Sequence, residues 1–267
     1  MLWNCKNGCV KLENGTMDYV SFGSGGKNLI LLPGLSDGLA TVKGKALLLA
    51  GPYRLFFKEY TVWMFSRRNE LKEGVSIRDM AADQAAAMEA LGIKKASVCG
   101  VSQGGMIAQV LAVDFPEKVE KLILAVTAPS ANETARECVE DWIRMAEGGD
   151  HKSLMIDTAE KSYSQAKLKS YRKLYPVLGM VGKPKSYERF LANARAILGF
   201  DATGDLGKIA CPTLILGGEE DKIVGAEASR ELHERIPGSR LYLYPGLGHA
   251  AYEEAKDFNR RICVFLK

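Results

Sequence analysis

The glycine-rich stretch GVSQG (residues 100–104) constrains the fold of this chain more than any other feature. A short apolar run, Ala96–Cys99, precedes it, and an apolar stretch with helical spacing, Gly104–Asp114, follows it. A serine at the tip of so tight a strand–turn–helix must adopt a positive φ, and the flanking glycines leave room because they carry no Cβ atom. We therefore predict that Ser102 projects from the sheet edge as a nucleophile, with the N–H of Gln103 at a helix N-terminus, where negative charge is favoured.

The order of the remaining elements predicts an α/β fold. An Asn-Gly turn at residues 14–15 joins two runs that read as a hairpin, Gly8–Glu13 and Thr16–Phe22. Apolar runs that suit buried strands then alternate with helical stretches, which is typical of a mostly parallel sheet flanked by helices. The further strands are expected at Asn28–Leu32, Tyr60–Phe65, Lys121–Val126, Thr213–Leu216 and Arg240–Tyr244, and further helices at Ile77–Leu91 and from Ala250 to Phe265.

One long segment interrupts this alternation, since no convincing strand lies between Ala128 and about Ile209. Helical spacing is found there at Glu133–Glu147, Ser153–Ser170 and Tyr187–Leu198. We expect residues 129–209 to form an inserted helical cap on a core made of residues 1–128 and 210–267. Inserted lids of this kind often cover and gate active sites.

A serine is a poor nucleophile without a base, and the chain has only three histidines. His151 lies in the expected cap, and His233 lies in a polar helix where a solvent-facing role is expected. His249 follows the last strand, in a loop of the kind that builds active sites in open α/β sheets. The acidic loop after the strand TLIL offers three carboxylates in a row, at residues 219–221, to orient that base. We choose Asp221, with the two preceding glutamates as rivals.

Composition excludes several classes. The net charge of +4 is mild for 267 residues, so a nucleic-acid partner is not indicated. No apolar run approaches the ~20 residues that span a bilayer, and no signal-peptide core is seen, so we expect a soluble cytoplasmic protein. The six cysteines form no CxxC pair, and we expect unlinked thiols, no metal site and no cofactor. A monomer or homodimer is expected.

Taken together, these motifs resemble the α/β-hydrolase fold family of small esterase, lactonase and C–C hydrolase type. GVSQGGMIAQ resembles the nucleophile turn and following helix of the family, GGEEDKIV its acid loop, and GLGHAAYEE its histidine loop. The order Ser102, Asp221, His249 matches the order of nucleophile, acid and base in the family. The resemblance also implies an oxyanion hole formed by the backbone N–H groups of Leu35 and Gln103.

Two departures from the family pattern stand out in the sequence. Many relatives have His-Gly where this chain has Pro33-Gly34, and many have Asp-x-Arg-Gly where residues 66–69 read SRRN. Neither change removes a catalytic group.

We expect a serine hydrolase that cleaves a small ester or related acyl substrate through an acyl-enzyme intermediate. The same triad could serve a C–C hydrolase, a lactonase or a cofactor-free perhydrolase. A protein of another class, a ligand-binding sensor with little turnover, is a further alternative. The expected pocket residues are Ser36, Trp142, Met145, Tyr163, Met180 and Val224.

Overall fold

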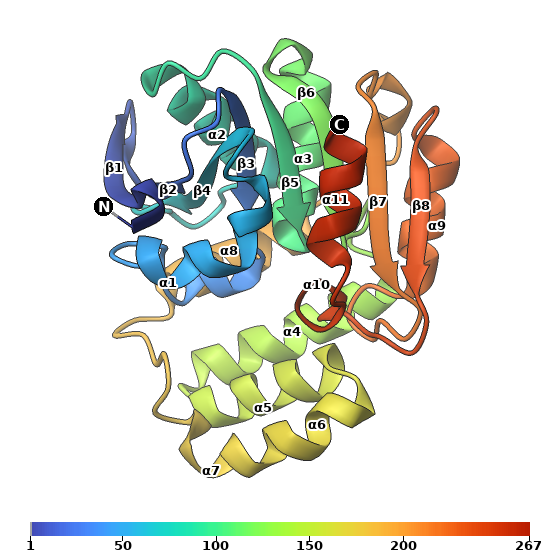
Figure 1. Ribbon diagram of the computed structural model, residues 1–267. Helices are drawn as coiled ribbons and strands as arrows, with labels where there is room; N and C mark the ends of the chain where they lie inside the picture. Colours follow the sequence, from blue (N-terminus) through green and yellow to red (C-terminus); the bar gives the residue numbers. More distant parts are fainter. Residues whose placement is uncertain (1) are drawn as a thin grey trace.

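Eight strands form one sheet in the order β1-β2-β4-β3-β5-β6-β7-β8 in the computed structural model, which describes residues 2–267 (Figure 1). The β1–β2 and β2–β4 pairs are antiparallel, and every other neighbouring pair is parallel. The predicted mostly parallel sheet is thus confirmed. The strands are β1 (Lys6–Leu12), β2 (Gly15–Phe22), β3 (Lys27–Leu32), β4 (Tyr60–Arg68), β5 (Ala96–Val101), β6 (Val119–Ala125), β7 (Thr213–Gly218) and β8 (Arg240–Tyr244).

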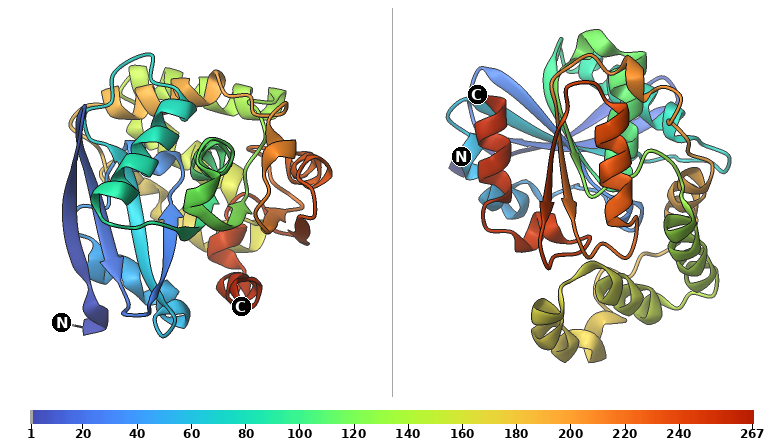
Figure 2. Two further views of the ribbon diagram at one scale, coloured as in Figure 1. Left: turned by 90° about the horizontal axis from the view of Figure 1, so that it is seen from above. Right: turned by 90° about the vertical axis from the view of Figure 1, so that its right-hand side faces the viewer.

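Helices cover both faces of this sheet (Figure 2). One face carries α2 (Ile77–Ala90), α3 (Gln103–Asp114) and α9 (Ala226–Arg235), which share one apolar cluster. The other face carries α1 (Ala46–Ala50), the 3-10 segment η3 (Gly51–Phe56) and α11 (Phe258–Leu266), which share a second cluster. Because both faces are buried, strands such as β3 and β7 are apolar along most of their length.

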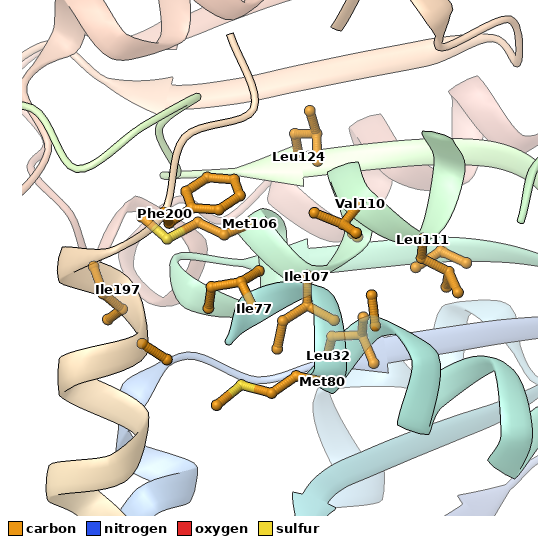
Figure 3. Close-up of a cluster of buried hydrophobic side chains, with 14 of the residues drawn as sticks. Leu32, Ile77, Met80, Met106, Ile107, Val110, Leu111, Leu124, Ile197 and Phe200 are labelled. Carbon is orange, nitrogen blue, oxygen red and sulfur yellow. The ribbon is translucent and has the colours of Figure 1, made fainter. Parts of the chain in front are cut away.

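The first apolar cluster extends beyond the sheet and its helices (Figure 3). Leu32 of β3, Ile107 of α3 and Leu124 of β6 pack in it together with Ile197 and Phe200, which lie between β6 and β7 in the chain. The segment that follows β6 is therefore joined to the sheet domain by shared apolar packing.

The regular elements within residues 131–200 are all helices, joined by turns, and an isolated bridge pairs Ser130 with Asp201. In Figure 1 the helices α4 to α7 lie beyond the end to which the arrows of β5 and β7 point. We call residues 129–209 the helical insertion. Its elements are α4 (Glu133–Glu147), α5 (His151–Ser162), α6 (Gln165–Tyr171), η5 (Arg172–Leu174), α7 (Tyr175–Leu178), α8 (Glu188–Leu198) and η6 (Leu206–Lys208).

Two predicted helices need correction, and two helical elements were missed. The helix expected over Ser153–Ser170 is two helices, because Tyr163 and Ser164 are extended and the Ser164 hydroxyl caps α6 by accepting from Lys167 N–H. The final helix is also divided, into α10 (Ala251–Glu254) and α11, with Ala255 extended. Neither α1 nor η3 was expected from the sequence. Short 3-10 turns complete the chain at η1 (Leu2–Asn4), η2 (Leu35–Gly38) and η4 (Pro116–Lys118).

Candidate active site

Ser102 occupies the strained turn that its sequence predicts. Its φ is 53° and its ψ is −121°, and it directly precedes α3. A Cβ atom at Gly104 would lie 2.0 Å from the carbonyl oxygen of Leu32, and one at Gly100 would lie 2.2 Å from that of Gly104. Only glycine fits at both places. The hydroxyl of Thr127 donates to the Ser102 carbonyl at 2.7 Å and holds the turn against β6.

His249 and Asp221 form a buried pair. The Nδ1 atom of His249 lies 2.8 Å from Oδ2 of Asp221, and both side chains are almost fully buried. The other carboxylate oxygen accepts from the N–H groups of Ile223 and Val224 at 2.8 and 3.0 Å. Glu219 and Glu220, by contrast, are exposed. With Nδ1 bound to the carboxylate, the Nε2 atom of His249 is left for a proton transfer.

Opposing effects act on the Asp221 carboxyl. Burial by itself raises its pKa, but the facing His249 and the two N–H donors stabilise the charged form more strongly, so the pKa lies below its ordinary value. A carboxylate that stays ionised in this way can orient the imidazole and stabilise it once it is protonated.

Ser102 and His249 line the same cavity, which has a volume of about 140 Å³. Within residues 2–267 no hydrogen bond joins the Ser102 hydroxyl to His249. Catalytic hydrogen bonds are often long in ligand-free sites and tighten when substrate binds, so this geometry is compatible with a nucleophile–base pair. The structure thus brings to one cavity two groups that lie 147 positions apart in the chain.

The loop after β3 runs beside the nucleophile. Leu32 of β3 pairs with Gly100 of β5, which brings this loop level with the Ser102 turn. A Cβ atom at Gly34 would lie 3.4 Å from that of Ser102. Leu35 and Gln103 are the first residues of η2 and α3, and neither N–H donates to another group within residues 2–267. Two free donors beside a serine can hold a developing oxyanion.

Comparison with known proteins shows the family to which the chain belongs. The family model described as serine aminopeptidase, S33, matches residues 74–256, more than half of the chain. The chain belongs to the α/β-hydrolase family. It is 30% identical over 196 residues to "Putative carbamate hydrolase RutD" from Klebsiella pneumoniae, covering 71% of this chain and 72% of the relative.

One further relative and one solved structure match nearly the whole chain. A 2-hydroxy-6-oxononadienedioate/2-hydroxy-6-oxononatrienedioate hydrolase from Pseudomonas putida is 25% identical over 277 residues, covering 97% of this chain and 95% of that one. The crystal structure of an enol-lactonase from Burkholderia xenovorans superposes with a TM-score of 0.84 at 20% identity, covering 97% and 99% of the two chains. The predicted α/β-hydrolase fold is thus confirmed.

A buried polar network lies behind the catalytic turn of this α/β-hydrolase. The Arg67 guanidinium donates to Oε1 of Gln103 at 2.9 Å, and the Gln103 amide donates to the Asn193 carbonyl of α8 at 2.7 Å. Arg189 of α8 forms an ion pair with the buried Asp37 of η2 at 2.7 Å, and Asp37 also accepts from Arg67 N–H. Burial, together with the nearby Arg189, lowers the pKa of Arg67 to about 10. The network ties α8 to η2, which begins at Leu35, and to the start of α3 at Gln103.

Arg67 stands in the segment SRRN, where many relatives carry a different turn. The departure is visible in the sequence, but the contact between Arg189 and the Arg67 carbonyl is not, because the two residues lie 122 positions apart. A cluster of charges on one face of a predicted helix, with an apolar face beside it, is the only sequence signal for such a contact.

Of the six predicted pocket residues, two line the cavity and four do not. Ser36 and Trp142 line the cavity of the hydrolase, whereas four others lie elsewhere. Met145 packs in the first apolar cluster, and Met180 is 75% exposed at the far end of the insertion. The remaining two make other bonds: Tyr163 donates to Glu253, and the N–H of Val224 binds Asp221. Side chains that line the cavity without having been predicted include Leu39, Leu154, Thr158, Ser162, Ile223 and Tyr252.

No cluster of three or more histidine, cysteine or acidic residues within residues 2–267 is placed to hold a metal ion. In the same range no helix has the length and apolar character needed to cross a bilayer.

Proposed function

We propose that this α/β-hydrolase is a serine hydrolase that cleaves an ester or related acyl substrate through an acyl-enzyme intermediate. The observation that carries the proposal is the meeting of a serine in a strained, positive-φ turn with a histidine whose Nδ1 is bound to a buried carboxylate. That combination supplies a nucleophile, a base and a group that orients the base.

In the proposed reaction His249 Nε2 takes the proton of the Ser102 hydroxyl as its oxygen attacks the substrate carbonyl. The negative charge that develops on the carbonyl oxygen is held by the N–H groups of Leu35 and Gln103. His249 then gives its proton to the departing alcohol, which leaves an acyl group on Ser102. Water that is deprotonated by His249 releases the acid and restores the serine.

The walls of the catalytic cavity favour an uncharged substrate. Among the residues 2–267 that line it, none is lysine or arginine. A dioate such as the substrate in the name of the Pseudomonas putida relative carries two carboxylates, which need cationic or N–H partners when they are buried. The nearby arginines, Arg67 and Arg189, are already bound to Gln103 and Asp37. This contrast supports a substrate whose part within this cavity is uncharged, as in an ester.

We further propose that the helical insertion acts as a cap over the site. Trp142, Leu154 and Phe190 of the insertion line the catalytic cavity together with Ser102 and His249. Ser162 at the end of α5 also accepts from the N–H of Ala250, directly after the catalytic histidine. Residues of the cap would therefore select which substrates reach the serine.

The decisive experiment is hydrolysis of p-nitrophenyl acetate by the purified protein and by Ser102→Ala. We expect kcat/KM to fall at least 1,000-fold in the variant, because the nucleophile is lost, a change comparable with the loss of triad members elsewhere. Ser186→Ala, an exposed serine outside the cavity, is the matched control and should keep full activity. Activity that persists in Ser102→Ala would contradict the proposal.

A fluorophosphonate probe, which reacts with activated serines, distinguishes a serine hydrolase from a ligand-binding sensor with the same fold. An activated serine should be labelled within minutes, and the label should map to Ser102 and disappear in His249→Ala. Tight ligand binding with no labelling would favour the sensor.

A further inference from the structure

A second, larger cavity adjoins the catalytic one. It has a volume of about 570 Å³, against about 140 Å³ for the cavity that holds the nucleophile. The two share four lining residues, namely Gly34, Ser36, Val101 and Tyr252. Gly34 and Val101 directly precede the oxyanion donor Leu35 and the nucleophile Ser102. The larger cavity therefore begins beside the reacting atoms.

The walls of this second cavity are mainly apolar. They come from β3, from α1 with η3 and from α11, and include Leu31, Leu49, Tyr53, Phe258 and Ile262. Its polar lining residues are Ser36, Glu253, Lys256 and Asn259, of which Lys256 and Glu253 are exposed. A mainly apolar space of this size is typical of small-molecule sites, and an alkyl chain gains free energy by leaving water for it.

The position of His249 decides which part of the substrate each cavity receives. The base must protonate the leaving alcohol, so the alcohol has to lie within hydrogen-bond reach of His249. His249 lines the smaller cavity and is not among the residues that line the larger one. With the carbonyl oxygen held at Leu35 and Gln103, the acyl chain is the part that remains to enter the larger cavity.

We propose that the second cavity is the acyl-chain site and that the substrates of this hydrolase are esters of medium-length, unbranched apolar acids. The inference rests on the proposed function and specifies its substrate class. The small catalytic cavity then takes a compact alcohol, and the larger cavity selects for acyl length.

The first test compares p-nitrophenyl esters from acetate to decanoate. Each methylene transferred from water to an apolar site is worth about 0.8 kcal/mol, or about fourfold in kcat/KM, so we expect at least a tenfold rise between butyrate and decanoate. A flat or falling series, with Ser102-dependent hydrolysis of the acetate, would overturn the inference and leave the proposed function intact.

The second test fills the cavity. Leu49→Trp should lower the ratio of decanoate to acetate kcat/KM at least tenfold, because the half-buried Leu49 lines the cavity. Leu47→Trp on the same helix is the matched control, since Leu47 is 57% exposed and lies outside the cavity lining. Ala255→Leu, at another half-buried lining position, should act in the same direction and replaces Leu49→Trp if that variant does not fold. A ratio unchanged in both filled variants would overturn the inference.

A binding measurement separates the two proposals if no ester is turned over. Calorimetry with Ser102→Ala should show decanoate binding at least tenfold more tightly than butyrate, whatever the reaction is. Equal affinities would overturn the acyl-chain site. Tight decanoate binding together with absent esterase activity would support the cavity and contradict the proposed chemistry.

Discussion

Two parts of the helical insertion are attached to the molecule in different ways. The anchored part, α4 and α8, shares the first apolar cluster with the sheet helices and holds the Arg189–Asp37 ion pair and the Gln103–Asn193 bond. The tip, residues 171–186, carries exposed apolar side chains, and its helix α7 lies far from the sheet, beyond α4 and α5 (Figure 1). The large exposed side chains of the tip are Leu174, Val177, Met180 and Val181.

The difference shows where the site gets its rigidity. Phe190 and Trp142, which line the cavity of Ser102 and His249, are on the anchored part, and α8 is bound to the segments that carry the two proposed oxyanion donors. The tip touches the anchored part mainly through α5, for example where His151 Nε2 lies 2.8 Å from the Val181 carbonyl. We therefore expect catalytic geometry to depend on the anchored part and to tolerate change in the tip.

The largest expected effect is on stability and comes from the buried arginine pair of the anchored part. Arg189→Ala leaves the buried Asp37 carboxylate without its ion-pair partner, and we expect the free energy of unfolding to fall by about 3 kcal/mol. Arg172→Ala in the tip removes an exposed pair with Glu160, which solvent screens, so it should lower the free energy of unfolding much less. Urea denaturation of both variants measures the difference. Equal losses would show that the two parts are held alike.

The contacts that distinguish the anchored part from the tip could not be predicted from the sequence. All eight strands could be predicted, and so could the loops that hold Ser102, Asp221 and His249, because apolar runs, glycine turns and loop positions are local signals. The pairing of Arg189 with Asp37 could not, because it joins residues 152 positions apart whose types alone suggest solvated charges. The cavity linings were missed for a similar reason: Leu49 and Tyr252 look like ordinary core side chains until α1 and α10 are placed against β3.

A smaller effect is expected in acid. The native pKa of Asp221 lies below its unfolded value, so its contribution to stability is present above about pH 4 and is lost as the pH falls through the native pKa. Asp221→Asn lacks this contribution, so the stability gap between the native protein and the variant should narrow from pH 6 to pH 3. Urea midpoints across that range measure it, and a gap that widens on acidification would show that the sign is wrong.

A comparable carboxylate, Glu160, lies on α5 and pairs with Arg172 of the tip. Hydrogen bonds from Arg172 and Tyr175 lower the pKa of Glu160 to about 2, so its contribution is likewise lost in acid. Because Glu160 is only partly shielded from solvent, we expect Glu160→Gln to change stability at pH 6 by less than about 1 kcal/mol. A larger loss than in Asp221→Asn would show that this partly exposed carboxylate stabilises the fold more than the buried one does.

The smallest effect should come from the exposed apolar residues. Met180→Ser in the tip should change the free energy of unfolding by about 0.5 kcal/mol or less, because the side chain is 75% exposed and little packing is lost. Thermal unfolding and p-nitrophenyl acetate hydrolysis of this variant should both match the native protein. A marked loss of activity would mean that the tip takes part in catalysis after all.

The close backbone packing around Ser102 and His249 limits where the specificity of this protein can be changed by mutation. A Cβ atom at Gly104 would lie 2.0 Å from the Leu32 carbonyl oxygen. One at Gly218 would lie 2.3 Å from the carbonyl oxygen of Gly248, which directly precedes His249. Random variation at these positions would mostly yield dead variants. A mutant library aimed at new specificities should leave these glycines unchanged and vary the residues that line the two adjoining cavities.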